Sequence, residues 1–201
     1  MKLTHGKVLD APIDLVWAHV TDLEMVGRCF PGAAVTEVHG TDFVGRIRSR
    51  LGPFTLQFQG TGAMTVADTE RHHARLQAIG VEQRGLGKVD IDITLDLAAD
   101  TTAGITDHST NDSTADAATG AGGGVRTQAD LTTVLVFSGA PMDFSAGLAQ
   151  RASDPLVSRF LTCMATPDGQ AHQHGDDAPL DLVSTVSEML GALTGLGRRR
   201  P

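Results

Sequence analysis

The most regular feature of the chain is an alternation of apolar and polar residues that runs from residue 34 to residue 98. Its clearest instance is KVDIDITLDLA at 88–98, where charged residues or threonine separate the apolar ones. Successive side chains of a strand point to opposite faces, so this pattern predicts an antiparallel strand with one buried face. The predicted buried face comprises Val89, Ile91, Ile93, Leu95 and Leu97.

The same alternation predicts further strands, most clearly over 54–66 and less regularly over 43–51, 72–81 and 129–137. In the segment 54–66 the odd positions are mostly threonine or glutamine, and the even positions are apolar or small. The even positions are Phe54, Leu56, Phe58, Gly60, Gly62, Met64 and Val66. We therefore expect an antiparallel sheet with one face turned to the core.

Helical patterns flank these strands. Pro12 suits the first turn of a helix over IDLVWAHV, and DLEMVGRCF predicts a second short helix that ends before Pro31. A longer helix is predicted from near Pro141 to Met164, and Pro155 is expected to kink or divide it. Its buried stripe would be Phe144, Leu148, Ala152, Leu156 and Phe160.

Two segments have no such pattern. Residues 99–124 are rich in Ala, Thr, Asp and Gly, with Ile105 as the only large apolar residue, and this composition predicts a disordered loop within a hairpin. Residues 165–179 form a polar stretch that predicts a flexible linker. The expected organisation is thus a domain at 1–164, a linker at 165–179 and a tail at 180–201.

The order of these elements predicts an α+β fold. A sheet with one apolar face and a helix with one apolar stripe bury both by packing together. We therefore expect a curved antiparallel sheet of about seven strands wrapped around a long C-terminal helix.

The first 33 residues, MKLTHGKVLDAPIDLVWAHVTDLEMVGRCFPGA, resemble the start of the helix-grip, START/Bet v 1-like (SRPBCC) superfamily. In particular they resemble the CoxG family found with aerobic molybdenum-containing carbon monoxide dehydrogenases. The resemblance rests on the APxDxVW helix start, the RCFPG turn at 28–32, the GPFTLQFQG strand at 52–60 and the C-terminal helix, and it covers about residues 1–164. It implies a fold with an internal apolar cavity, and as partner a molybdenum carbon monoxide dehydrogenase or a related hydroxylase.

Small residues on the predicted inner face bear on that cavity. Gly60, Gly62, Ala74, Ala78 and Gly80 share the face with larger apolar residues. Small side chains there leave room for a ligand; alternatively they allow a close approach of the helix, or they mark bulges that curl the sheet.

An apolar cavity with few polar groups suits an uncharged apolar guest, such as a lipid or an isoprenoid quinone. The residues predicted to line it are Trp17, Phe30, Leu56, Phe58, Gly60, Gly62, Met64, Leu76, Ala78, Leu95, Leu131, Phe137, Phe144, Leu148 and Phe160.

Composition narrows the function further. The formal net charge is -8 and no basic stripe is present in the body of the chain, which argues against nucleic-acid binding. The N-terminus lacks an apolar signal segment and no stretch has about 18 consecutive apolar residues, so we expect a cytoplasmic protein.

Cys29 and Cys163 have no neighbouring cysteine, and we expect both to be unpaired, buried apolar residues rather than a disulfide.

No catalytic or metal-binding pattern is evident. His72 and His73 are adjacent in a predicted strand and would point to opposite faces, and His172 and His174 lie in the polar linker. The chain has no tyrosine, which removes one common acid. We therefore expect a protein that is not an enzyme and has no metal or covalent cofactor. The alternative of a cyclase or dehydratase would have to use His5 or His73.

The tail is amphipathic and ends in three arginines. Asp181 and Glu188 make a membrane span unfavourable, so we expect a helix that lies on an anionic membrane surface. The alternative is that its apolar stripe packs on the domain or on a second subunit. The predicted membrane-binding residues are Leu182, Val186, Met189, Leu190, Leu193, Arg198, Arg199 and Arg200.

Together with the resemblance, these features predict a non-catalytic carrier. It would bind a lipid or quinone and link the dehydrogenase to the respiratory chain at the inner face of the cell membrane. A docking protein that recruits the dehydrogenase without any ligand is the alternative.

Overall fold

A computed structural model describes residues 1–51, 54–85, 87–100, 125–139, 146–167 and 180–181 of the protein. The predicted loop beyond Asp100, most of the linker and the tail from Leu182 lie outside the described residues, as do Phe144 and the side chains of Leu56 and Leu148. The elements, in chain order, are β1 (Lys2–Leu9), α1 (Ile13–Thr21), α2 (Leu23–Cys29), β2 (Ala33–His39), β3 (Asp42–Leu51), β4 (Phe54–Asp68), β5 (His73–Glu82), β6 (Lys88–Asp100), β7 (Arg126–Ser138), α3 (Ala146–Met164) and β8 (Leu180–Asp181).

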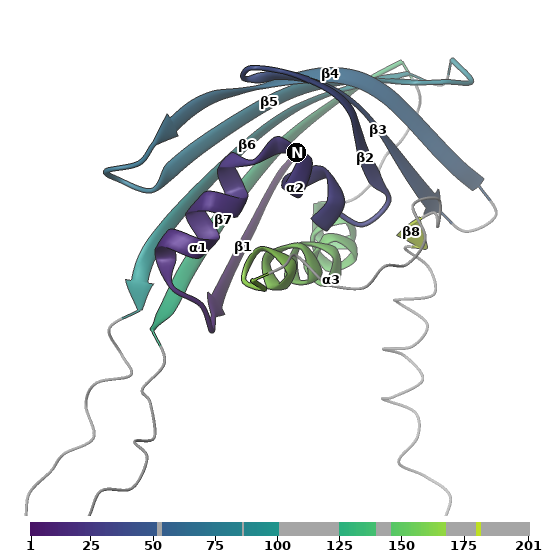
Figure 1. Cartoon of the computed structure of the whole chain (residues 1–201). Helices are drawn as coiled ribbons and strands as arrows, with labels where there is room; N and C mark the ends of the chain where they lie inside the picture. Colours follow the sequence, from purple (N-terminus) through teal and green to yellow (C-terminus); the bar gives the residue numbers. More distant parts are fainter. Residues whose placement is uncertain (52–53, 86, 101–124, 140–145, 168–179, 182–201) are drawn as a thin grey trace, which may run out of the picture.

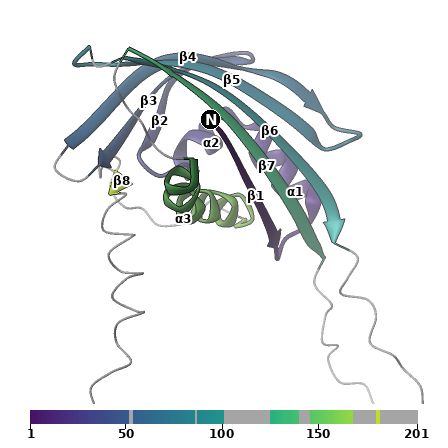
Figure 2. The same cartoon turned by 180° about the vertical axis from the view of Figure 1, so that it is seen from behind.

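The strands form one sheet in the order β1-β7-β6-β5-β4-β3-β2, with antiparallel neighbours throughout. The short β8 adds to β3 in parallel, where Leu180 pairs with Ser49 and Asp181 with Arg50. The sheet curves over the helices, and α1, α2 and α3 all lie on the same side of it (Figures 1 and 2). The predicted seven-stranded antiparallel sheet with a C-terminal helix against it is confirmed.

The period-two pattern gives the sheet its two faces. Leu95 of β6 pairs with Leu131 of β7 and with Ala74 of β5, and all three are buried against the helices. On the opposite, outer face Asp92 pairs with Gln77, whose amide donates to the Asp92 carboxylate over 2.8 Å. We call the helix-covered side the inner face.

The two short helices form as their sequences predict. Pro12 immediately precedes α1, whose buried side is formed by Val16, Trp17 and Val20. Asp22 caps α2, because its carboxylate accepts hydrogen bonds from the backbone amides of Glu24 and Met25. The chain therefore turns sharply between two helices that both pack on the inner face.

The long helix α3 supplies the largest fully buried side chains, Leu161 and Met164. It continues through Pro155 as one helix, so Pro155 does not divide it. At its C-terminal end the Met164 carbonyl lies 2.8 Å from Nδ1 of His19 in α1.

The structure contradicts the prediction that the two cysteines are unpaired. Cys29, the last residue of α2, forms a disulfide with Cys163 of α3, and their Cα atoms are 5.6 Å apart. Both are buried, as expected, but their pairing across 134 residues depends on how α2 packs on α3. No local spacing in the sequence signals such a pair.

A row of polar contacts, here called the polar seam, fixes α3 to the edge strand β1. Lys7 donates from Nζ to the hydroxyls of Ser158 and Thr162, each at 2.7 Å. The side-chain amide of Gln150 bonds to both backbone groups of Thr4, accepting from its N–H over 3.1 Å and donating to its carbonyl over 2.9 Å. Hydrogen bonds of the seam join α3 to β1, and Figure 2 shows α3 under the arch of the sheet with β1 next to it.

Candidate functional site

The inner face of the sheet has two halves that differ in how well they are covered. In the first, which we call the packed half, the strand residues lie against α1 and α3 and are buried. Its strand members are Leu9, Ala74, Leu95, Leu97, Ala129 and Leu131. Trp17 lies above this half and donates from Nε1 to Thr69, with the His72 ring edge-on at 5.4 Å between ring centroids. The packed half is an ordinary close-packed core.

The other half, which we call the open half, contains several inward-facing apolar residues that are incompletely covered, although Val89 of β6 on the same face is buried. Phe137 is 37% exposed and the other members are half-buried, and none of them belongs to the core cluster. The open half comprises Phe43, Ile47, Phe58, Leu76, Ile91, Leu135 and Phe137. Together they form an apolar surface contributed by β3 to β7.

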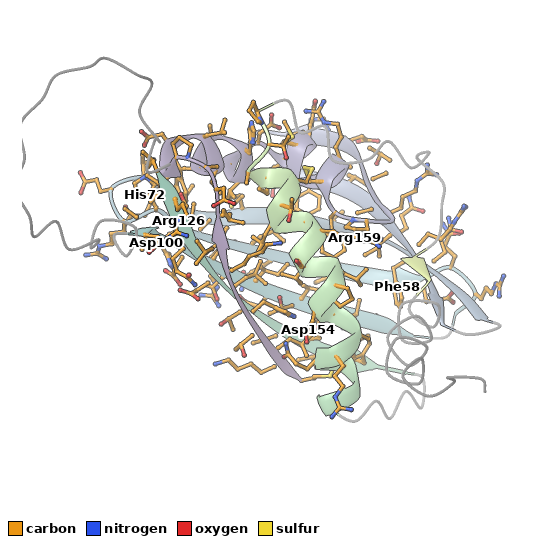
Figure 3. The ribbon with its side chains drawn as sticks, turned by 90° about the horizontal axis from the view of Figure 1, so that it is seen from below. Phe58, His72, Asp100, Arg126, Asp154 and Arg159 are labelled. Carbon is orange, nitrogen blue, oxygen red and sulfur yellow. A yellow bond between two sulfur atoms is a disulfide. The ribbon has the colours of Figure 1, made fainter. Side chains whose placement is uncertain are left out.

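The position of α3 explains the difference. The helix contacts β1, α1 and α2, and the polar seam and the disulfide hold it there. Figure 3 views the inner face from below and shows His72, Asp100 and Arg126 at one end and Phe58 near the other. Arg159 projects from α3 to the side on which Phe58 and β8 lie, and no described residue bonds to it. The helix therefore directs a cation, without a partner among the described residues, toward the side on which Phe58 of the open half lies (Figure 3).

The glycines of β4 have a different role from the one predicted. A Cβ at Gly60 would overlap the backbone carbonyl of Ile79 in β5, and a Cβ at Gly62 would lie 2.5 Å from Cζ of Phe43. Gly60 thus permits a close approach of two strands, and Gly62 makes room for the Phe43 ring. Neither a close approach of the helix nor a bulge is found at these two positions, because their neighbours belong to adjacent strands and the register shift between β4 and β5 lies between Met64 and Val66.

The structure divides the predicted cavity residues between the two halves. Those at the open half are Phe58, Gly60, Gly62, Leu76, Ala78 and Phe137. Those at the packed half are Trp17, Phe30, Leu95, Leu131 and Phe160. Met64 lies at the border, because it is partly buried against the core. Leu56, Phe144, Leu148 and the predicted membrane-binding residues of the tail cannot be placed, since they lie outside the described side chains.

Four members of the open half were missed by the sequence interpretation: Phe43, Ile47, Ile91 and Leu135. The signal for them was present. Ile91 belongs to the alternating face of 88–98, and the register places Leu135 opposite Ile91 and Phe43 opposite Gly62. The prediction followed the small residues of β4 and β5 and overlooked the large ones opposite them.

The two histidines considered for an enzyme lie away from the open half. His5 lies in the polar seam, with Nε2 at 3.0 Å from Ser153 Oγ and at 3.3 Å from Oδ1 of Asp154. Burial lowers the pKa of His5 below its usual value, and the charge of Asp154 opposes this shift. His73 is on the outer face, where Nδ1 lies 2.6 Å from Asp96. The two histidines proposed for an enzyme are therefore on opposite faces of the sheet.

Other buried polar groups in the described part of the chain bond locally. Glu82 accepts from the backbone amide of Arg84 over 2.7 Å, at the end of β5. Asp100 and Arg126 pair at 3.0 Å where β6 ends and β7 begins. No cluster of three or more potential metal ligands occurs among the described residues. These contacts join neighbouring strands and turns of the fold.

A shallow hollow of about 810 Å³ lies on the outer face. Its floor includes Ile79, Val134 and Val136, and Asp90 and Asp92 lie beside them. Arg75 and then Gln77 hydrogen-bond to Asp92 and lower the pKa of this carboxyl. The hollow also borders Phe43 and Ile91, whose side chains face inward by register, so the outer hollow and the open half lie on opposite sides of the same strands.

None of the described helices is long and apolar enough to cross a membrane. Proteins of known structure share the fold at low sequence identity. A conserved protein from Geobacillus kaustophilus is 14% identical, with a TM-score of 0.60, over 82% of this chain and 93% of that chain. The Zhui aromatase/cyclase from Streptomyces sp. R1128 is 16% identical, with a TM-score of 0.43, over 98% of this chain and 99% of that chain. The similarity to the Geobacillus kaustophilus protein supports the fold alone.

No curated protein matches the sequence. A family model does: the model for carbon monoxide dehydrogenase CoxG matches residues 7–109, just over half of the chain. The matched region contains α1, α2, the disulfide residue Cys29, β2 to β6 and most of the open half. This chain therefore belongs to the CoxG family of carbon monoxide dehydrogenase.

Proposed function

We propose that the protein is a non-catalytic carrier that holds a lipid or an isoprenoid quinone against the open half of its inner face. The observation that carries the proposal is the contrast within β6, where Leu95 is 4% exposed while Ile91, four residues away on the same face, is only half-buried. Apolar surface left accessible costs roughly 25 cal/mol per Å², and an apolar ligand would remove that cost.

The chemistry of the surroundings supports a ligand with a polar head and an apolar body. The members of the open half offer no hydrogen-bonding groups, while Arg159 beside them offers a guanidinium with no described partner. An arginine donates several hydrogen bonds in a fixed plane, which suits a carbonyl, carboxylate or phosphate oxygen. We assign Arg159 to the head group of the ligand.

Family membership supports the partner. In this proposal the protein serves a molybdenum carbon monoxide dehydrogenase or a related hydroxylase, and it carries the quinone or lipid between that enzyme and the membrane of the respiratory chain. The tail, with its apolar stripe and Arg198 to Arg200, would bring the domain to an anionic membrane surface.

The carrier function is tested with a matched pair of isoleucines. Ile91 faces inward in the open half and Ile79 faces outward in the outer hollow, so Ile91→Asn and Ile79→Asn make the same chemical change on opposite faces. Binding of the fluorescent apolar probe N-phenyl-1-naphthylamine would be titrated for both variants and for the parent. We expect Ile91→Asn to weaken binding about tenfold, a loss of about 1.4 kcal/mol, and Ile79→Asn to leave it unchanged.

Two results would contradict the proposal. If the parent does not bind the probe, the protein recruits the dehydrogenase without a ligand. If Ile79→Asn is the variant that loses binding, the site is the outer hollow. Organic extraction and mass spectrometry of the protein purified from its native host would then identify the natural ligand, and thermal unfolding would confirm that both variants fold.

Membrane association and compartment need separate measurements. Flotation with anionic liposomes should recover the full chain but not a variant with Arg198, Arg199 and Arg200 all replaced by Ser; equal recovery would contradict the membrane role.

Disulfides persist mainly in oxidising compartments, and the expected location is cytoplasmic. Thiol labelling in rapidly quenched cells would show whether Cys29 and Cys163 are oxidised there.

A further inference from the structure

We propose that residues 182–197 of this chain occupy the open half when no ligand is bound, so that the tail and the ligand compete for the same surface. The inference rests on the proposed function only in naming the ligand as the competitor. Its basis is the position of β8, the size of the open half and the apolar pattern of residues 182–197.

The chain is already docked at the rim of the open half just before this segment. Leu180 and Asp181 pair with Ser49 and Arg50 of β3, beyond the point where β2 ends its own pairing with β3 at Ile47. Figures 1 and 2 both show β8 beside the end of β3, on the helix-covered side of the sheet. Asp181, the residue from which the segment continues, therefore lies at the β3 edge of the sheet.

Length and pattern fit the open half. A helix of 16 residues is about 24 Å long, and the five strands from β3 to β7 span about 19 Å at the usual strand spacing. At 100° per residue, Leu182, Val186 and Leu193 fall within one apolar sector whose centre is close to Val186. Such a sector, laid across β3 to β7, would cover half-buried residues such as Phe58, Ile91 and Leu135.

Because residues 182–197 belong to the same chain, they have an advantage over a ligand in solution. Because the segment follows β8 directly, its effective concentration at the open half is in the millimolar range expected for short tethers. An external ligand must displace the segment, and its apparent affinity falls accordingly. An anionic membrane that binds the apolar stripe and the terminal arginines would withdraw the segment and open the site.

The experiment uses the full chain and a pair of substitutions two residues apart. Val186→Asp places a charge in the centre of the apolar stripe, whereas Ser184→Asp places the same charge on the opposite side of the predicted helix. Both are made in a Phe137→Trp background, because Phe137 is partly exposed in the open half while the native Trp17 is buried and gives a constant signal.

The first readout, acrylamide quenching of the new tryptophan, needs no ligand. We expect Val186→Asp to increase quenching at least twofold and Ser184→Asp to leave it at the parent value. The second readout is affinity for N-phenyl-1-naphthylamine, which we expect Val186→Asp to raise three- to tenfold. Thermal unfolding of each variant confirms an intact domain.

The outcomes separate this inference from the proposed function. If quenching responds as expected but no variant binds the probe, the segment covers the open half and the carrier function is wrong. If the probe binds and Val186→Asp and Ser184→Asp behave alike in both readouts, the carrier function stands and the inference is overturned. Quenching that does not change in Val186→Asp overturns it whatever the probe shows.

Discussion

The packed and open halves of the inner face are built from the same strands and the same alternating pattern, yet they end in different states. Leu95 and Ile91 are both inward residues of β6, and Leu95 is buried whereas Ile91 is only half-buried. The difference is caused by the position of α3, which covers only one half of the inner face. Polar bonds to β1 and a disulfide to α2 hold α3 over one half of the sheet.

The comparison shows how a fold can keep an apolar surface accessible without losing its core. The helix is attached at an edge by hydrogen bonds from Lys7 and Gln150, which do not need the apolar centre of the sheet. The core is completed at the other end by Leu161, Met164 and Trp17. The packed half thus stabilises the fold, while the open half of the same face keeps its apolar side chains accessible.

The largest expected effect comes from truncating one side chain in each half. Leu161→Ala removes a fully buried side chain from the packed half, and we expect a loss of about 2–5 kcal/mol in the free energy of unfolding. Ile91→Ala in the open half should cost less than about 1.5 kcal/mol, because its side chain is only half-buried. Urea unfolding measures both; similar losses would show that the open half is as well packed as the other.

Removal of the disulfide should have the next largest effect. The double variant Cys29→Ala, Cys163→Ala is expected to lose about 2–4 kcal/mol, since the bridge closes a long loop in the unfolded chain. The measurement is urea unfolding of the variant and of the parent with and without dithiothreitol. If the parent is equally stable under both conditions and matches the variant, the bridge does not fix α3 in solution.

Two glycine-to-alanine substitutions compare a crowded position in the sheet with an open position in α3. Gly60→Ala places a methyl group against the carbonyl of Ile79, and we expect it to cost about 1–3 kcal/mol. Gly147→Ala in α3 meets nothing within 4 Å and should stabilise the protein by up to about 1 kcal/mol. Thermal unfolding would show shifts of opposite sign; a neutral Gly60→Ala would restore the interpretation that this glycine leaves empty space.

The smallest expected effect is the pH dependence that His5 introduces. Its pKa is lowered in the folded protein, so below the usual histidine pKa the unfolded chain binds a proton that the folded protein resists. Stability should therefore fall as the pH drops through that value, and His5→Gln should reduce the fall. Comparing unfolding at pH 7.5 and pH 5.5 tests this; a steeper fall in His5→Gln would mean that protonated His5 is stabilised by Asp154.

Sequence alone predicted the fold well because its signals are local. The alternation over 88–98 identified the inner face of β6 residue by residue, and Pro12 and Asp22 mark the starts of the short helices. The division of the inner face could not be predicted, because it depends on where α3 lies. The contacts that decide this join Lys7 to Ser158 and Cys29 to Cys163, and each pair is separated by more than 130 residues.

The glycines show a second limit. A small residue on an inner face has the same pattern whether it leaves a cavity or lets two backbones approach. At Gly60 the carbonyl of Ile79 lies so close that a side chain would overlap it. At Gly62 the ring of Phe43 occupies the space that a side chain would need. Register and backbone distance, rather than residue size, distinguish the two cases, and neither can be read from one sequence.

The contact between Gln150 and Thr4 has a consequence for how the protein behaves at high concentration. The exposed border of β1 presents unpaired backbone groups that a strand from another molecule could join. The side-chain amide of Gln150 accepts from the N–H of Thr4 and donates to its carbonyl. It thus satisfies both backbone groups of Thr4 as a neighbouring strand would. Gln150 thereby interrupts the template for intermolecular strand addition, and a protein with an accessible apolar surface gains resistance to aggregation along this border.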